Sequence, residues 1–211
     1  MPVIGILRSI WTYPVKSLAC MALDETEIGE GGIPGDRARA LIVGDGHARV
    51  GKSYRGKENN MLHTTDSIDR ARALAAAKAV RVELHEDQPH YFDAAPISLI
   101  FDRWLDEASL LVGYALEPLR FRPNLFARAV PDFRDNEATL VGAHLSIGEV
   151  TLEVREPIER CVTPTYDLQT GESDPNVLRA IAQYRANCLG IYCDVLRPGR
   201  VGLGDKIRLS P

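Results

Sequence analysis

The chain consists mostly of short segments in which apolar and polar residues alternate, separated by turn residues. Residues 3–13 alternate loosely, residues 21–28 alternate apolar with acidic side chains, and residues 37–43 end at a Gly-Asp-Gly turn. Alternation with a period of two indicates strands with one buried face. Further strands are predicted over residues 80–85, 119–128, 143–154 (a hairpin with its tip at Gly148-Glu149), 158–162, 189–196 and 206–209.

Three helices are predicted between the strands, over residues 65–79, 97–111 and 175–186. The first is rich in alanine and has Asp66 or Ser67 as its cap. The second carries apolar side chains on one face at the helical period. The third begins with Asp174 as its cap and Pro175 at its first helical position.

Many short strands, few helices and no regular alternation of the two predict a mainly β or α+β fold, a β-barrel with a few peripheral helices. A doubly wound parallel sheet is disfavoured for the same reason. A chain of 211 residues suits a single compact unit. A seam near Gln88-Pro89 would divide it into residues 1–88 and 89–211, although the composition does not change there.

Charge and hydropathy exclude several classes of function. The net charge is −4 and the sequence pI is about 5.8, so no overall basic field attracts nucleic acid or an anionic membrane. The first residues do not have the pattern of a secretory signal, and no apolar stretch approaches the roughly 20 residues of a membrane-spanning helix. We therefore expect a cytoplasmic protein with four reduced cysteines and without nucleic-acid or membrane partners.

The stretch GHARVGKS, residues 46–53, matches the pattern Gly-x-x-x-x-Gly-Lys-Ser of phosphate-binding loops. Such a loop requires a helix that starts at the Lys-Ser pair, so that its N–H groups face the phosphates. Here a glycine and two asparagines follow without an apolar stripe. We instead predict a hairpin in which residues 47–53 return alongside residues 37–43. A nucleotide-binding protein, in which Lys52 would hold ATP, stays open as an alternative.

Two other patterns approach metal sites without the required spacing. His85 and His90 nearly match His-Glu-x-x-His, but the second histidine comes one residue late and Pro89 would break the helix. Cys188 and Cys193 are separated by an odd number of residues, which places them on opposite faces of a regular strand. We interpret both as small apolar core thiols.

Cys161 has a different environment. It follows Arg160 directly, at the point where a strand runs into a polar turn. A cation beside a thiol favours the thiolate, which is the form that attacks electrophiles or binds soft metals. A buried strand cysteine beside a surface arginine is the alternative that these residues alone leave open.

Five motifs in this order resemble one family: YPVKS (13–17), GGIPGDR (31–37), RFRPNLFA (120–127), ERCVTPTYDLQTGE (159–172) and LRPGRVGLGDKIRL (196–209). Together they are similar to the MOSC proteins, the sulfurase C-terminal domain family. Within it the chain resembles proteins with an N-terminal β-barrel segment, such as the mitochondrial amidoxime-reducing component. The resemblance covers nearly the whole chain and is thinnest between residues 52 and 91.

The resemblance implies a MOSC-type β-barrel that holds the molybdenum cofactor, a pterin dithiolene with a terminal phosphate. It implies that Cys161 is the molybdenum ligand and the catalytic residue. Roles in cofactor binding carry over to Lys16, Ser17, Arg37, Arg122, Glu159, Arg160 and Tyr192. Basic and hydroxyl side chains suit a phosphate. Lys52 or Arg55 could also meet it, whereas Ala94-Ala95 replaces the Thr-Ser pair that relatives often have before the next proline.

The activity implied by the resemblance is an oxidoreductase that reduces N-hydroxylated or related N–O compounds at molybdenum. The four cysteines do not form the quartet of an iron–sulfur cluster, so the electrons would come from a separate ferredoxin-, flavoprotein- or cytochrome-type partner. Two alternatives stay open. Cys161 could carry sulfur as a persulfide, or the protein could bind the cofactor without catalysis.

Overall fold

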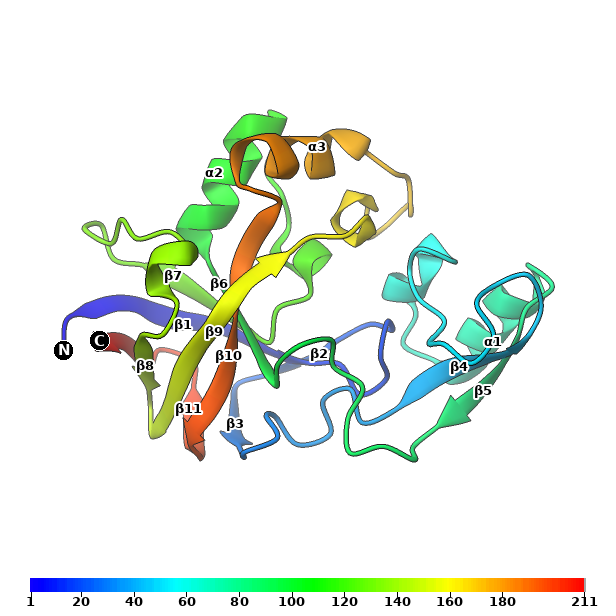
Figure 1. The fold of residues 1–211 in the computed structure, drawn as a ribbon, viewed down its shortest axis with the longest axis horizontal. Coiled ribbons are helices and arrows are strands. Elements are labelled where there is room, and N and C mark those ends of the chain that lie inside the picture. The colour runs from blue at the N-terminus through cyan, green and yellow to red at the C-terminus, as the bar shows by residue number, and fades with distance from the viewer. Residues whose placement is uncertain (211) are drawn as a thin grey trace.

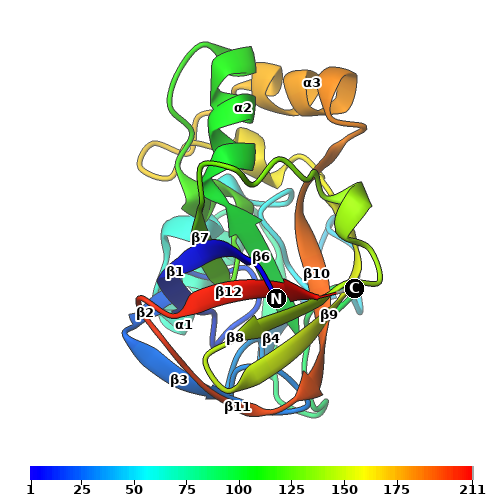
Figure 2. The ribbon, with the colours of Figure 1, turned by 90° about the vertical axis from the view of Figure 1, so that its left-hand side faces the viewer.

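The computed structural model describes residues 1–210, and seven of its strands close into a barrel. The main sheet runs β12-β8-β9-β10-β6-β7-β1-β2, and β12 also pairs with β1, so that the ring closes and leaves β2 outside (Figures 1 and 2). Among the described residues, all ring pairings are antiparallel except that of β6 with β7. The strands are β1 (Val3–Thr12), β2 (Met21–Leu23), β6 (Ile97–Phe101), β7 (Leu125–Ala129), β8 (His144–Ile147), β9 (Val150–Glu159), β10 (Cys188–Arg197) and β12 (Lys206–Ser210).

Alternating apolar side chains fill the interior of the barrel. On β9, Val150, Leu152 and Val154 are buried, whereas the residues between them are partly exposed. Leu7 and Ile10 of β1 belong to the same cluster. The period-two pattern thus places one face of each strand in the core, as the sequence predicted. A separate ribbon of β3 (Glu25–Ile28) and β11 (Gly199–Gly202) lies at the edge of the barrel in Figure 2.

A side lobe, residues 40–85, lies at the opposite end of the molecule from the two termini (Figure 1). Its apolar residues form their own cluster, which includes Leu41, Leu62, Ala71 and Val82. Ser67 caps its α-helix by accepting a hydrogen bond from the backbone N–H of Arg70, which confirms one of the two predicted caps. The lobe contains β4 (Ala40–Asp45), the 3-10 helix η1 (Asn60–Thr64), α1 (Ile68–Ala76) and β5 (Arg81–His85).

Two α-helices, α2 (Asp102–Val112) and α3 (Pro175–Tyr184), cover another side of the barrel, at the top of Figure 1. They pack against each other through a third apolar cluster that includes Leu105 and Ile181. Asp174 caps α3 as predicted, by accepting from the N–H of Asn176. The remaining helices are short 3-10 segments: η2 (Pro118–Phe121), η3 (Ala138–Leu140) and η4 (Thr163–Thr165).

The predicted helix over residues 97–111 is wrong in its first third. Residues 97–101 form β6, and all five of them are buried, because the barrel core lies on one face and the helix layer on the other. A strand covered on both faces does not alternate, so its apolar run resembled the start of the following helix. The predicted strand over 21–28 likewise divides into β2 and β3, and the one over 119–128 begins as η2.

The predicted hairpin between residues 37–43 and 47–53 forms only in part, at residues 51–53. β4 pairs with β5, in antiparallel register with Leu41 opposite Leu84. The GHARVGKS segment forms no strand, but its end returns alongside β4: Ser53 bridges Ile42, and Val43 exchanges backbone hydrogen bonds with Gly51 and Lys52. Lys52 is exposed, and the next helical segment begins only at Asn60. The scaffold of a nucleotide-binding loop does not form around Lys52.

We expect Gly190→Ala to lower the free energy of unfolding more than Gly204→Ala. Both glycines have a left-handed φ, +92° and +90°, so each substitution introduces about 1–2 kcal/mol of backbone strain. A Cβ at position 190 would also lie 2.8 Å from Ile100 Cγ1 and 3.0 Å from the Leu99 carbonyl oxygen, whereas position 204 is open. Overpacking adds about 1–3 kcal/mol. Urea denaturation measures both losses, and equal values would contradict this packing.

Candidate functional site

A cleft that opens to solvent and encloses about 210 Å³ is lined by residues of the barrel, of the loops around β1 and of the side lobe. Eight residues that the sequence assigned to cofactor or metal binding line it together: Lys16, Ser17, Arg37, Arg122, Glu159, Arg160, Cys161 and Tyr192. These residues come from four of the five motifs and from β10, and these segments are far apart along the chain. The structure therefore brings the predicted residues to one place, while their individual roles stay predictions.

The thiol of Cys161 is exposed at the cleft. Cys161 comes two residues after the end of β9 and just before η4. Its Sγ lies 3.3 Å from Thr163 Oγ1, within hydrogen-bond distance for sulfur. The preceding Glu159 is also exposed and accepts from the Asn187 side chain. The alternative of a buried structural cysteine at position 161 is therefore wrong.

Arg160 directly precedes Cys161 and binds backbone carbonyls. Its Nε donates to the Leu189 carbonyl at 2.7 Å, and its Nη1 donates to the Phe121 carbonyl at 2.9 Å. The guanidinium also stacks over the Phe121 ring at 5.3 Å. Burial lowers the pKa of Arg160 to about 10. These contacts fix the end of β9 to β10 and η2, and so they position the cysteine that follows.

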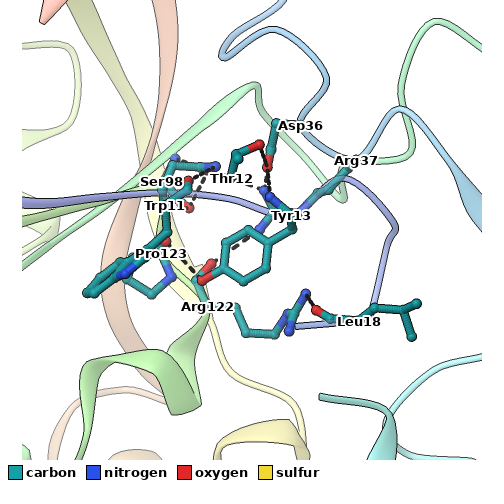
Figure 3. Close-up of polar contacts among 10 residues, drawn as sticks. Trp11, Thr12, Tyr13, Leu18, Asp36, Arg37, Ser98, Arg122 and Pro123 are labelled. Atoms are coloured by element: carbon teal, nitrogen blue, oxygen red, sulfur yellow. Dashed lines mark hydrogen bonds and ion pairs between the residues drawn. The ribbon is translucent and has the colours of Figure 1, made fainter. Parts of the chain in front are cut away.

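The Tyr13 ring lies between two guanidinium groups, as Figure 3 shows. The Arg37 guanidinium carbon is 4.6 Å from the ring centroid, and that of Arg122 is 4.2 Å away. The Tyr13 hydroxyl donates to the Pro123 carbonyl at 3.1 Å, and Arg122 Nη2 donates to the Leu18 carbonyl at 2.7 Å. Burial lowers the pKa of Arg122 to about 10 and raises that of Tyr13.

Asp36 connects the strand end to this sandwich. Its Oδ1 accepts from the backbone N–H of Tyr13 at 2.7 Å, and its Oδ2 pairs with Arg37 Nη1. Arg37 Nη1 also lies 3.3 Å from Asn124 Oδ1, which accepts from the Ser98 hydroxyl at 2.9 Å. The orientation of Arg37 is therefore determined by Asp36, Asn124 and the Tyr13 ring.

Three of the predicted residues have an unusual backbone conformation. Ser17, Arg37 and Arg122 adopt φ values of 72°, 47° and 54°, in the left-handed region that favours glycine. Such a conformation costs about 1 kcal/mol or more for a residue with a side chain, and such residues cluster at functional sites. These three positions thus retain a hydroxyl or a guanidinium where glycine would be less strained.

The cleft contains more buried positive charge than its acidic residues compensate. Lys16 pairs with Asp93 at 2.5 Å, and Arg120 pairs with Asp167 at 2.7 Å. Within residues 1–210, neither Arg122 nor Arg160 has a carboxylate within 4.0 Å. A buried charge without a counter-charge is costly. An anionic ligand in the cleft would provide that counter-charge.

His63 of η1 is a cleft residue that sequence reasoning missed. Its Nδ1 lies 2.9 Å from the Ser17 carbonyl oxygen and 3.2 Å from Arg122 Nη1. Burial, and then the charge of Arg122, lower the pKa of His63 from 6.5 to about 3. Of the two basic residues expected near a phosphate, Arg55 lines the cleft and Lys52 does not. Neither His63 nor Arg55 belongs to a recognised motif, so only the fold could reveal their position.

Two other features are absent from the described part of the chain. Residues 1–210 contain no group of three or more His, Cys, Asp or Glu side chains arranged to hold a metal ion. None of the helices in the same range has the length and apolar character needed to cross a membrane.

The sequence model of the MOSC domain matches residues 86–208, which is more than half of the chain. The chain belongs to the MOSC domain family. The matched range includes the segments of Arg122, Cys161 and Tyr192, and the expected family is thereby confirmed. Lys16, Ser17 and Arg37 precede the matched range and enter the cleft through β1 and the loops that follow it.

Two curated relatives are described as molybdenum cofactor sulfurases. The protein of Caenorhabditis elegans is 38% identical over 130 residues, which are 59% of this chain and 18% of the relative. That of Caenorhabditis briggsae is 38% identical over 95 residues, 42% of this chain and 13% of the relative. The MOSC chain therefore spans less than a fifth of the length of these relatives.

Two solved structures show the same fold at low sequence identity. The YuaD protein of Bacillus subtilis is 20% identical, with a TM-score of 0.61 over 97% of this chain and 94% of its own. YiiM of Escherichia coli is 13% identical, with a TM-score of 0.51 over 100% and 71%. The likeness confirms the predicted mainly β, α+β barrel with a few peripheral helices.

We expect Tyr13→Leu to destabilise this MOSC protein more than Tyr13→Phe. The phenylalanine variant keeps a ring between the two guanidinium groups and loses only the hydroxyl bond to Pro123, which is worth about 1–3 kcal/mol. The leucine variant also loses the two cation–π contacts, each worth about 0.5–2 kcal/mol. Urea denaturation measures the difference. Equal losses would show that the ring faces contribute nothing.

His63 predicts a specific dependence of stability on pH. Its pKa is near 6.5 in the unfolded chain and about 3 in the folded protein, so the unfolded chain binds the extra proton between these values. The contribution is fully present above pH 6.5 and is lost as the pH falls toward 3, at up to about 1.4 kcal/mol per pH unit. His63→Asn should lack this component. The test compares unfolding free energies of the two proteins at several pH values, and parallel curves would contradict it.

Proposed function

We propose that this MOSC protein binds the molybdenum cofactor in its cleft and acts as a molybdenum-dependent oxidoreductase. One observation carries the proposal: two buried arginines, Arg122 and Arg160, which have no carboxylate partner among residues 1–210, lie with an exposed cysteine in the same cleft. The family and the two relatives described as molybdenum cofactor sulfurases support the same cofactor.

The residues of the cleft fit the chemistry of this cofactor. Lys16, the Ser17 hydroxyl, Arg37 and Arg122 supply the positive charge and donors that a phosphate requires. Cys161 supplies a soft thiolate, the ligand type that suits molybdenum. The enclosed 210 Å³ is below the roughly 300 Å³ of typical ligand pockets, so part of the bound group would face the open mouth.

When bound, the cofactor would supply a metal that exchanges electrons and accepts an oxygen atom from an N-hydroxylated or related N–O compound. The chain's own residues would bind and orient it. Arg160 holds the strand end next to Cys161, and Tyr192, whose pKa burial raises, borders the cleft from β10. Glu159 is an exposed acid beside the metal ligand.

Turnover would require electrons from a second protein. The proposed donor is a ferredoxin-, flavoprotein- or cytochrome-type partner in the cytoplasm, where the four unpaired cysteines of the chain stay reduced. The exposed position of Cys161 would place the metal near the molecular surface, within reach of such a partner.

A second candidate function follows from the same exposure of Cys161. A thiolate at the surface could take the outer sulfur of a donor persulfide, while the donor's own sulfur leaves as a thiolate. The protein would then be a sulfur carrier, and the description of the relatives as sulfurases favours this alternative. A third possibility is cofactor binding without catalysis.

We expect Cys161→Ala, produced in a host that makes the cofactor, to contain less than about a tenth of the wild-type molybdenum, because a thiolate is the strongest soft ligand that the cleft offers. Metal analysis gives the molybdenum content, and pterin fluorescence shows whether the organic part stays bound through the basic residues. Cys20→Ala is the matched control, because Cys20 is a partly buried thiol outside the cleft lining.

Three outcomes are distinguishable. Full molybdenum in Cys161→Ala would contradict the site, and equal loss in the Cys20 variant would point to misfolding. Wild-type protein without molybdenum at any stoichiometry would contradict the oxidoreductase. In that case, cyanide-labile sulfur that disappears with Cys161→Ala would support the carrier.

A further inference from the structure

His63 occupies a position where the side lobe meets the predicted cofactor-binding residues. η1 of the lobe carries it, and its ring contacts the backbone of Ser17 and the guanidinium of Arg122. Both neighbours are predicted to bind the cofactor, and His63 lines the same cleft. The imidazole is therefore part of the cleft wall although no sequence motif includes it.

The contacts of Nδ1 determine which ring nitrogen carries the proton. The Ser17 carbonyl oxygen, 2.9 Å away, can only accept a hydrogen bond, and Arg122 Nη1, 3.2 Å away, can only donate one; we assign the proton to Nδ1 because the contact with Ser17 is the shorter of the two. Arg122 Nη1, 3.2 Å from the same nitrogen, is a cation and disfavours a second positive charge on the ring. The imidazole is thus neutral, with a lone pair on Nε2.

Nε2 is a buried acceptor with no partner among residues 1–210. Gly56 covers it: a Cβ built on Gly56 would lie only 2.1 Å from Nε2, so no other residue fits at position 56 while the ring keeps this orientation. A buried acceptor without a hydrogen bond costs about 1–3 kcal/mol, which a ligand could recover. Residues 55–57, which include Gly56, also line the cleft, so Nε2 lies directly behind its wall and a ligand reaches this nitrogen when Gly56 is displaced.

The polarity of Nε2 is opposite to that of most of the cleft. Lys16, Arg37, Arg122 and Arg160 present donors, which recognise the acceptor oxygens of an anion. Nε2 instead requires a donor. A ligand that satisfies both carries an anionic group together with an N–H group, as a heteroaromatic amine with a phosphate or carboxylate substituent does.

We propose that His63 binds the ligand directly, by accepting a hydrogen bond at Nε2 from an N–H group of a heteroaromatic ring. The inference rests on the proposed function, in which the pterin is that ring, and it names the residue that recognises it. His63 then distinguishes a pterin from a simple anion, while the arginines bind both.

Two substitutions separate the two nitrogens of the ring. The amide of His63→Asn reaches the Nδ1 position and can still donate to Ser17, but it offers nothing at Nε2. His63→Gln reaches the Nε2 position with an acceptor oxygen. Each variant is titrated, as purified cofactor-free protein, with pterin-6-carboxylate by fluorescence and with inorganic phosphate by calorimetry. Unfolding curves check that both variants fold.

We expect His63→Asn to weaken binding of pterin-6-carboxylate roughly tenfold and to leave phosphate binding within about twofold of wild type, since one hydrogen bond is lost and the basic residues stay. His63→Gln should recover most of the pterin affinity. Equal pterin affinity in wild type and His63→Asn, or an equal loss in both variants, would overturn the role of Nε2. So would wild-type protein that binds phosphate but not the pterin. Wild-type protein that binds neither probe would instead refute the proposed function itself.

Discussion

A tyrosine ring between two guanidinium groups organises the cleft. Tyr13 directly follows β1, Arg37 precedes β4 and Arg122 precedes β7, so the sandwich joins three segments that are distant in sequence. Two like charges this close would repel each other, but the negative faces of the ring and the carboxylate of Asp36 compensate part of the repulsion. Arg37 and Arg122 both have a positive φ, so the backbone at these two positions adopts the less favourable left-handed conformation within the sandwich. The donors of the cleft are therefore in position before any ligand arrives, which reduces the entropy lost on binding.

Much of this arrangement could be predicted from local patterns. Strands that have one face in the core, such as β1 and β9, alternate clearly, and Asp174 and Ser67 located two helix starts. Cys161 was indicated by the adjacent Arg160 and by the resemblance to the MOSC family, and Arg122 by that resemblance alone. Both residues line the same cleft, and both lie within the range that matches the MOSC domain.

The features that could not be predicted depend on contacts between distant segments. β6 lacks alternation because the barrel and the helix layer cover its two faces, and nothing local distinguishes it from the helix that follows. β4 pairs along its length with β5 across the intervening α1, whereas the adjacent GHARVGKS segment, which was the expected partner, meets it only at residues 51–53. His63 was missed because a single histidine in a polar stretch has no signature. Its importance arises only where η1 meets Ser17 and Arg122.

The parallel pairing of β6 with β7 has a consequence for how this fold can vary. Parallel strands begin at the same end of a sheet, so Ala95 before β6 and Arg122 before β7 both lie at the cleft. An antiparallel pair would have delivered Arg122 to the far end of the barrel. The crossover through α2 therefore acts as a spacer: insertions near Gly113, at its outer turn, lengthen the surface without moving the cleft. An insertion between Arg122 and Leu125 would instead displace the guanidinium from Tyr13, so only the helical side of the connection can change in length while the cleft keeps its form.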